Sequence, residues 1–245
     1  VVITSIDNDQ RFYRIKSKLS VITIFFQNGQ RTGKSDIFEI FEDGEAAVQK
    51  VIEARGGRPS STKKKIDFFK KNYFVDLMCV FNTMTAKLYK KIITGEVFVT
   101  GSILNNNIKI SKTINNNLVF ISLFRAYRKQ EYFKNKILLS LLETYCEKNN
   151  LKLSILAKHP HDTPGADEEK KYYEDSLGKE FLFFKNYKNR NTYKIIDEAK
   201  IVVSPGSTLG IESLGRKKKT AILNYRADQK FYKKKNFGYF TKKGN

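Results

Sequence analysis

The chain has 245 residues, with 46 Lys and Arg against 25 Asp and Glu, which gives a formal net charge of +21 at pH 7. A hydrophobic content of 40% supplies a core and excludes wholesale disorder. No apolar run approaches the roughly 18 residues that a membrane-spanning helix needs, and two His and two Cys without metal-ligand spacing argue against a zinc enzyme or a disulfide framework.

Short apolar, β-branched runs alternate along the chain with segments of helical length. This alternation predicts an α/β fold with parallel sheets and crossover helices. Strands are predicted at residues 1–6, 21–26, 75–81, 96–100, 118–123, 152–157, 180–184, 200–204 and 220–224. The clearest helix is predicted over 128–148, where three- and four-residue spacing places on one face Phe133, Ile137, Leu138, Leu141, Leu142 and Tyr145.

The first part of the chain, about residues 1–105, is expected to form an α/β domain that is incomplete at its N-terminus. It opens on an apolar, strand-like run without an initiator Met or a signal peptide, so we expect a fragment of a longer protein. The strand at 21–26 leads into Gln27, Asn28 and Gly29, with Arg31 close behind. These residues are either one side of a cleft or an ordinary Asn-Gly turn.

Two short acidic motifs in this first part are candidates for chemistry. Asp7 and Asp9 match the Asp-x-Asp pattern with which some sugar-transfer enzymes bind a metal–diphosphate group. Glu42 and Asp43, followed by Gly44, could hold a general base. Loops and helix ends provide such motifs freely, so a solvent-facing loop explains each of them as well.

An Asn-rich segment at 106–117 interrupts the pattern and is predicted to be a linker, because clusters of Asn are typical of loops. Residues 118–227 then hold five of the predicted strands with intervening helices and are predicted to form a second domain, and 228–245 form a basic tail. Arg125 follows the first strand of this domain and could face the same cleft as Arg31.

The sharpest motif lies at 200–215, where a buried strand ends in a turn at Pro205 and Gly206 and a helix opens at Ser207 or Thr208. Ser and Thr are good N-caps, glycine lets a ligand approach the backbone, and the amides at a helix start favour an anion. The motif is therefore a candidate phosphate cradle, with Glu212 one turn later on the face of Thr208. An ordinary capped strand–turn–helix is the alternative.

A second motif ends the strand at 152–157 with Lys158, His159 and Pro160. Proline keeps the preceding residue extended, so the imidazole is expected at the carboxyl edge of the strand, where it and Lys158 could meet a phosphate. A surface histidine is the alternative. Parallel strands would bring this motif and the Ser-Thr turn to one edge of the same sheet.

The positive charge has two interpretations. A basic surface suits polyanions such as nucleic acid, anionic lipid or phosphorylated sugars. However, lysine far outnumbers arginine and the lysines are scattered, as a compositional bias would produce.

The order of these motifs resembles the second domain of GT-B glycosyltransferases, most of all the bacterial surface-carbohydrate-biosynthesis proteins related to glycerophosphotransferases and capsule sugar transferases. The resemblance runs over about residues 1–227, and its specific parts are His159-Pro160 and Ser-Pro-Gly-Ser-Thr-Leu-Gly-x-Glu-Ser-x-Gly at 204–215. It implies two Rossmann-like domains. It also implies donor contacts from His159, Pro160, Ser207, Thr208 and Glu212, and it weakly assigns a base to the motif of Glu42 and Asp43.

We therefore expect a glycosyltransferase that moves a sugar from a nucleotide-activated donor to a polysaccharide or lipid-linked acceptor. No cofactor or metal is expected to be required. The expected location is the cytoplasm, a reducing compartment, with peripheral contact to the anionic inner face of the plasma membrane. The alternatives are a polyol-phosphate transferase with a CDP-linked donor and a non-enzymatic nucleic-acid-binding protein, although the aromatic residues look like core and favour no specific nucleic acid.

Overall fold

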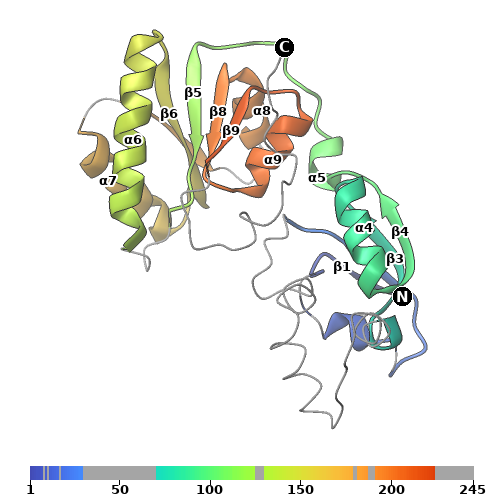
Figure 1. The fold of residues 1–245 in the computed structure, drawn as a ribbon. Coiled ribbons are helices and arrows are strands. Elements are labelled where there is room, and N and C mark those ends of the chain that lie inside the picture. Colours follow the sequence, from blue (N-terminus) through green and yellow to red (C-terminus); the bar gives the residue numbers. More distant parts are fainter. Residues whose placement is uncertain are drawn as a thin grey trace, which may run out of the picture. The chain divides into compact units, whose positions relative to one another are not determined.

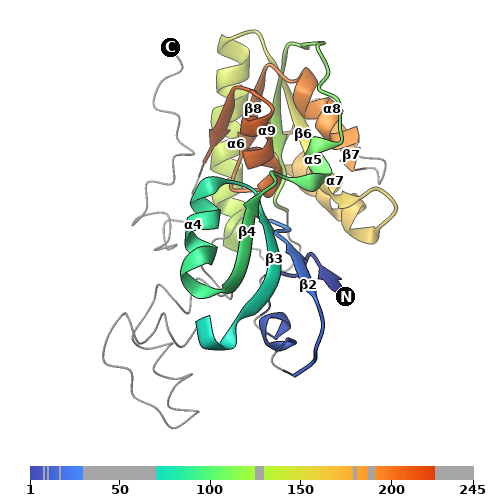
Figure 2. The ribbon, with the colours of Figure 1, turned by 90° about the vertical axis from the view of Figure 1, so that its right-hand side faces the viewer.

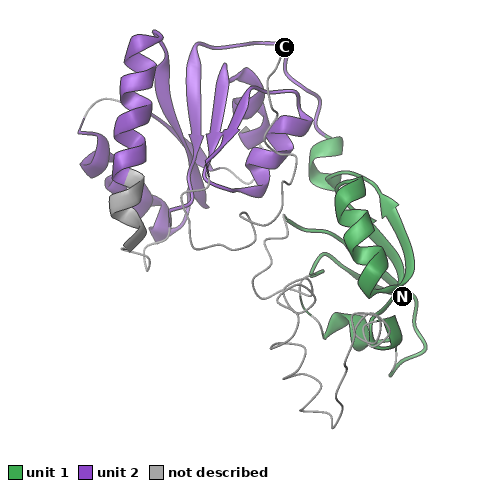
Figure 3. Cartoon of the chain, in the orientation of Figure 1, with its two compact units in different colours: residues 1–107 green, residues 108–245 purple. Residues whose placement is uncertain are grey.

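The computed structural model describes residues 1–29 apart from 8, 10 and 17, together with residues 70–124, 130–178, 181–186 and 191–223. The chain divides into two compact units, residues 1–107 and 108–245, coloured green and purple in Figure 3. The division falls inside the Asn-rich segment that the sequence marks as a linker.

Unit 1 is built on a parallel sheet with the strand order β1-β2-β3-β4. The strands are β1 (Val2–Thr4), β2 (Thr23–Phe26), β3 (Phe74–Val80) and β4 (Thr94–Val99). Its described helices are the 3-10 turn η1 (Phe12–Arg14), α4 (Thr83–Ile92) and α5 (Ile103–Asn106) (Figure 1). Each strand therefore follows its neighbour in the sequence, so the sheet advances in one direction.

Among the described residues of unit 1, one hydrophobic core forms between the sheet and the segments around it. The Asn82 side chain caps α4 by accepting from the Thr85 amide. The helix then presents Tyr89 and Ile92 to the sheet, and both are fully buried. These side chains join Tyr13, Phe25 and Met78 in one hydrophobic core.

Unit 2 contains a five-stranded parallel sheet with the order β7-β6-β5-β8-β9. The strands are β5 (Asn117–Ile121), β6 (Lys152–Pro160), β7 (Leu182–Asn186), β8 (Ile201–Ser204) and β9 (Thr220–Ile222). The helices are α6 (Gln130–Lys148), α7 (Pro164–Leu177), α8 (Asn191–Glu198) and α9 (Thr208–Gly215) (Figures 1 and 2). The chain reverses its direction across the sheet at β5, so the sheet is doubly wound.

Alternate residues of the central strand β5 belong to two separate cores. Leu118 and Phe120 pack with residues of α6 and α7. Val119 and Ile121 pack with residues of α8 and with Leu209 of α9. Helices thus cover both faces of the sheet, which is why the strands of unit 2 are almost continuously apolar.

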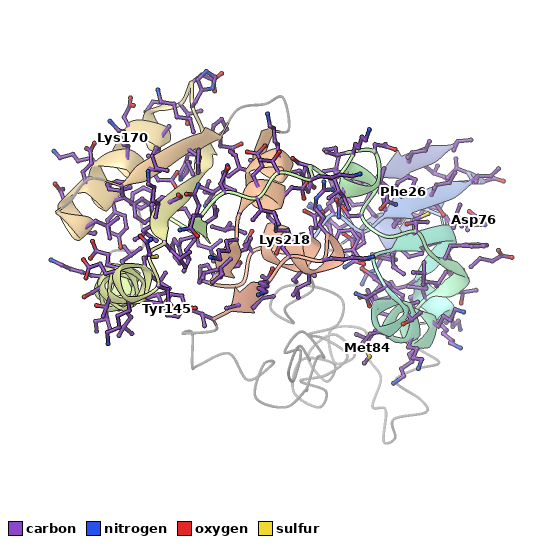
Figure 4. All side chains as sticks on the ribbon, turned by 90° about the horizontal axis from the view of Figure 1, so that it is seen from above. Phe26, Asp76, Met84, Tyr145, Lys170 and Lys218 are labelled. Carbon is purple, nitrogen blue, oxygen red and sulfur yellow. The ribbon has the colours of Figure 1, made fainter. Side chains whose placement is uncertain are left out.

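The structure confirms the α/β class with parallel sheets, and all nine predicted strands overlap the observed ones. Helix α6 is also confirmed, but its predicted inward face is only partly right, because Leu138 and Leu142 pack into the core while other members of that face do not. It buries Leu139, Leu142 and Cys146, whereas Ile137 is 49%, Leu141 is 63% and Tyr145 (labelled in Figure 4) is 44% exposed. Neither α6 nor any other helix in the described ranges is both long and apolar enough to cross a membrane.

Candidate functional site

The carboxyl ends of β6, β5 and β8 lie at one edge of the sheet of unit 2, because these three strands are parallel neighbours. The direction of winding reverses between β5 and β8, and open α/β sheets bind ligands outside the strand ends at such a reversal. The motif of Lys158 and His159 ends β6, and the turn that contains Gly206 and Ser207 follows β8. The topology therefore brings the two strongest sequence motifs to the same sheet edge.

The turn after β8 is ordered by one side chain. The Ser204 hydroxyl accepts hydrogen bonds from the amides of Gly206 (3.3 Å) and Ser207 (3.0 Å). Gly206 has a φ of +105°, a conformation that favours glycine. Ser207 is the N-cap of α9, and its hydroxyl accepts from the amide of Leu209 at 3.3 Å. The predicted turn and the predicted helix start are thus confirmed.

This turn has the chemistry of an anion site. Residues 206–209 are half-buried, so solvent reaches the start of α9. The acceptor that orders the turn amides is a neutral hydroxyl at 3.0–3.3 Å. Hydrogen bonds to a charged oxygen are roughly twice as strong as neutral ones, and the helix dipole adds to the attraction. The turn is therefore a candidate site for a phosphate oxygen.

Helix α9 presses closely on the end of β8. A Cβ atom placed on Gly210 would lie 2.3 Å from the Ser204 Cβ and 2.4 Å from its Oγ. The Ser213 hydroxyl ties the helix to β9, since it donates to the Gly210 carbonyl at 2.6 Å and lies 2.7 Å from the Thr220 hydroxyl. Gly210 is therefore required for the close packing that fixes the turn, a role the sequence did not reveal.

The end of β6, which carries Lys158 and His159, is held by a buried carboxylate that sequence reasoning missed. Glu169 of α7 is 0% exposed and accepts from the Lys158 amide at 2.9 and 3.2 Å and from the His159 amide at 2.9 Å. A signal was available. Glu169 lies at helical spacing between Ala166 and Tyr173 on the buried face of α7, and a charged residue on such a face needs a partner.

The imidazole of His159 packs on the α7 side of the sheet. Its ring meets Phe124 edge-on, with a centroid separation of 6.0 Å and an interplanar angle of 75°. Its Nδ1 lies 2.8 Å from where a Cβ on Gly165 would be. Its Nε2 is buried and has no hydrogen-bond partner within the described residues, which is uncommon for a buried polar atom. Helix α9 packs in the opposite helix layer, so the ring shares the sheet edge with the Ser-Thr turn and not its layer.

Lys158 and Pro160 complete the end of β6. The Lys158 Nζ donates to the Phe124 carbonyl at 3.2 Å, which brings its ammonium group to the end of β5. Pro160 pairs with Asn186 of β7, and its carbonyl accepts from the Thr163 hydroxyl at 2.7 Å. The cation is thus placed beside the point where the winding reverses.

Glu212 lies one turn into α9 and is half-buried. Its Oε2 accepts from the Tyr193 hydroxyl at 2.9 Å. The Tyr193 ring lies beneath the guanidinium of Arg216, with the Arg216 Cζ 5.3 Å from the ring centroid. The sequence pointed to Glu212, and the structure adds its partner on α8.

A buried ion pair joins α8 to the end of α9. The Arg216 Nε and Nη2 donate to the two carboxylate oxygens of Asp197, each at 2.6 Å, and the side chains are 3% and 0% exposed. This bonding raises the pKa of Arg216. Arg216 also donates to the carbonyls of Ile108 (3.2 Å) and Lys109 (3.4 Å), and Asp197 accepts from the Ser111 amide at 2.8 Å. Sequence reasoning had no signal for this pair, because its members are separated in sequence by a strand.

In unit 1, the predicted cleft residues lie just after β2. The Gln27 side chain donates to the Gly29 carbonyl at 2.8 Å and accepts from the Phe81 amide at 2.9 Å. The Asn28 amide donates to the buried Asp7 carboxylate at 3.2 Å. Asp7 also accepts from the Tyr89 hydroxyl at 2.6 Å.

The two carboxylates of the Asp-x-Asp motif have different partners. Asp7 is 0% exposed, whereas Asp9 pairs with the largely exposed Arg11 at 2.5 Å, and this bonding lowers the pKa of Asp9. Among the residues that the structure describes, no group of three or more His, Cys, Asp or Glu side chains is arranged to hold a metal ion. Four predicted site residues lie outside the described residues: Arg31, Glu42, Asp43 and Arg125.

Comparisons with known proteins give one family match. The model of a family described as "putative O-antigen biosynthesis protein" matches residues 60–245, about three quarters of the chain. Comparison with curated proteins finds no match.

Similar solved structures include the wall teichoic acid polymerase TagF, at 10% identity and a TM-score of 0.44 over 84% of this chain and 50% of that chain. A TagF variant soaked with CDPG gives 9% identity and a TM-score of 0.45 over 92% and 53%. The E. coli heptosyltransferase WaaC with ADP-2-deoxy-2-fluoro heptose gives 10% and 0.34 over 89% and 86%. The chain thus spans about half the length of the two polymerase chains, and at these TM-scores the similarities carry no functional assignment.

Proposed function

The chain belongs to the family of O-antigen biosynthesis proteins, and from this premise we propose that it is a glycosyltransferase with a nucleotide-activated sugar as its donor. The acceptor in this proposal is a growing surface polysaccharide or its lipid-linked precursor. In this proposal the two units serve as the two Rossmann-like domains of a GT-B enzyme, with the donor bound by unit 2 and the acceptor by unit 1.

The observation that carries the proposal is the turn between β8 and α9. Its amides are ordered by a neutral hydroxyl, it is open to solvent, and it lies beside the reversal point of a doubly wound sheet. A nucleotide diphosphate or monophosphate supplies the negative oxygens that such a turn prefers. Ser207 and Thr208 add hydroxyl groups to the same turn.

Lys158 supports the leaving group from the neighbouring strand end, since its ammonium lies at the end of β5. His159 shares this sheet edge, but its ring packs on the α7 side, where its buried Nε2 lacks a partner within the described part of the chain. In the reaction, an acceptor oxygen bonds to the anomeric carbon while the bond from that carbon to the donor phosphate breaks. The electron pair leaves on the phosphate, and preorganised positive groups stabilise that charge.

The acceptor side rests on residues outside the described ranges. We assign the general base, which takes the proton of the acceptor hydroxyl, to Asp43 or Glu42. The excess of Lys and Arg suits contact with an anionic leaflet that carries a lipid-linked acceptor.

A thermal-shift screen tests the proposal. The chain is incubated with CMP, CDP, UDP and GDP, with their sugar conjugates and with a CDP-linked polyol. A ligand that binds the folded state raises the Tm. We expect one nucleotide and its sugar conjugate to do so, and Ser207→Ala combined with Thr208→Ala to remove most of that shift while lowering stability by only about 1 kcal/mol.

Ser140→Ala is the matched control, because Ser140 is exposed in the middle of α6. Absence of a shift with every nucleotide compound contradicts the proposal. Preference for the CDP-linked polyol over all sugar conjugates replaces it with polyol-phosphate transfer. Tight binding of random DNA with a steep salt dependence replaces it with a nucleic-acid-binding role.

A further inference from the structure

Tyr193 connects the candidate donor site to the buried ion pair of unit 2. Its hydroxyl donates to the Glu212 Oε2 at 2.9 Å, and its ring packs against the guanidinium of Arg216. The tyrosine is 6% exposed. One side chain therefore contacts a half-buried carboxylate on α9 and the fixed cation behind it.

The support of Tyr193 is rigid. Arg216 makes two 2.6 Å hydrogen bonds to Asp197, and both side chains are almost completely buried. A fork-to-fork pair of this kind fixes the plane of the guanidinium. The Tyr193 ring packs against this guanidinium and is itself buried, so the Tyr193 hydroxyl is held in place, and with it one oxygen of Glu212.

An ionised carboxylate only accepts hydrogen bonds, so its partners on a nucleotide are hydroxyl groups. The phosphates bind at the start of α9 in the proposed function, and Glu212 lies one turn further along the same helix. A ribose linked to those phosphates presents hydroxyl donors at a comparable distance from them. A carboxylate can distinguish a ribonucleotide from a 2′-deoxynucleotide only if its oxygens are oriented toward the ribose hydroxyls. When the ligand lacks the 2′-hydroxyl, the oriented oxygen is left without its donor, and this costs affinity.

We propose that Tyr193 is a positioning residue that orients Glu212 toward the ribose hydroxyls of the nucleotide, with the Arg216–Asp197 pair as its support. This inference rests on the proposed function. It assigns no chemical step to Tyr193. It makes Tyr193 a determinant of the preference for a ribonucleotide over the corresponding 2′-deoxynucleotide.

The test is a double-mutant cycle read by calorimetry with CDP, UDP and GDP, each beside its 2′-deoxy counterpart. The variants are Tyr193→Phe, which keeps the ring on Arg216, Glu212→Gln and their combination. We expect the wild type to prefer one ribonucleotide by about tenfold and each single variant to lose most of that preference. The double variant should lose no more than Glu212→Gln alone, because coupled residues are non-additive.

Tyr89→Phe is the matched control. It also removes a tyrosine hydroxyl that donates to a carboxylate, but in unit 1, where the buried Asp7 accepts it at 2.6 Å. It should lower the Tm and leave the ribose preference of the chain unchanged. A fall in Tm without a change in preference would therefore mark a purely structural role for Tyr193 as well.

The outcomes separate the two proposals. If the wild type binds no nucleotide, the proposed function fails and the positioning role fails with it. If the wild type and Tyr193→Phe show the same ribose preference while Glu212→Gln loses it, the donor site stands and the role of Tyr193 is overturned. Additive losses in the double variant overturn it too. If Tyr193→Phe unfolds, a second variant, Arg216→Lys, is used, because it alters the guanidinium against which the ring packs. A ribose preference equal to that of the wild type in Arg216→Lys overturns the role of Tyr193. Loss of that preference in a folded Arg216→Lys variant supports it.

Discussion

Asp7 in unit 1 and Ser204 in unit 2 occupy comparable places, because each accepts a hydrogen bond from the backbone of a turn that follows a parallel strand. Asp7 is a buried carboxylate that holds the Asn28 amide and the Tyr89 hydroxyl. Ser204 is a neutral hydroxyl that holds the amides of Gly206 and Ser207. An ionised carboxylate would repel a phosphate, whereas a neutral hydroxyl would not. Of these two strand ends, the end of β8 is therefore the one to which we assign the nucleotide in the proposed function.

The largest expected effect on stability comes from replacing Asp7, the acceptor of unit 1. Asp7→Asn replaces a carboxylate oxygen with an amide group that faces donors, and we expect the free energy of unfolding to fall by about 3 kcal/mol. Urea denaturation measures the loss. Asp9→Asn is the control, because the partner of Asp9, Arg11, is 89% exposed and such pairs contribute under about 1 kcal/mol. Equal losses in the two variants would contradict a structural role for Asp7.

The next largest effect comes from disturbing the close packing of Gly210 on Ser204, the acceptor of unit 2. In Gly210→Ala the new methyl group overlaps Ser204, so α9 must shift. We expect a loss of about 2 kcal/mol in stability and loss of the nucleotide-induced thermal shift. A Cβ on Gly215, in the same helix, meets no atom within 4 Å, so Gly215→Ala should change neither measurement. A Gly210→Ala variant with an unchanged nucleotide shift would show that the turn needs no such packing.

A smaller effect tests whether phosphate replaces the hydroxyl itself. Ser204→Ala leaves two turn amides without their acceptor, which should lower stability by about 1 kcal/mol. Because a phosphate oxygen would supply the missing acceptor, the nucleotide-induced rise in Tm should be at least as large as in the wild type. Ser154→Ala is the control, since the buried Ser154 hydroxyl has no partner in the described ranges and its removal should be nearly neutral. Loss of nucleotide binding in Ser204→Ala would mean that the hydroxyl is a ligand contact.

The smallest expected effect is a pH-dependent contribution of Asp76 to the stability of unit 1. Hydrogen bonds from Lys16 and from Thr23 lower the pKa of Asp76 in β3. The folded pKa lies below the unfolded value of about 3.9, so this contribution is present above that value and is lost as the pH falls through the folded pKa. Asp76→Asn should lower the Tm of unit 1 by a few degrees at pH 7 and by less near pH 3. Asp175→Asn is the control, because Asp175 is exposed on α7 in unit 2, and it should leave the Tm of unit 1 unchanged.

Local patterns were sufficient to locate the strands, because short β-branched apolar runs bounded by polar turns form strands more readily than helices. The same holds for Ser207 as an N-cap and for Gly206 in the turn. The face of α6 was beyond this kind of reasoning. Leu138, Leu139, Leu141 and Leu142 occupy successive positions around the helix, so spacing alone could not decide which of them face the sheet.

The supports of the candidate site were equally hidden. Glu169 is recognisable only once the buried face of α7 is known, and Asp197 and Arg216 meet only after β8 and α9 have folded. Such pairs depend on tertiary packing, which no local periodicity encodes. The placement of His159 against Phe124 likewise follows from the packing of α7 onto the sheet.

The carbonyls of Ile108 and Lys109, bound by Arg216, have a practical consequence for dissecting the chain. A truncated polypeptide that begins at Leu118, inside the first strand of the sheet, would keep the guanidinium but delete two of its acceptors. It would also delete the Ser111 amide, which donates to Asp197. One that begins at Ile108 retains them all. A truncated version of unit 2 should therefore begin at Ile108, because the hydrogen bonds of Arg216 and Asp197 reach that far. This start lies ten residues before the one that the strands alone would suggest.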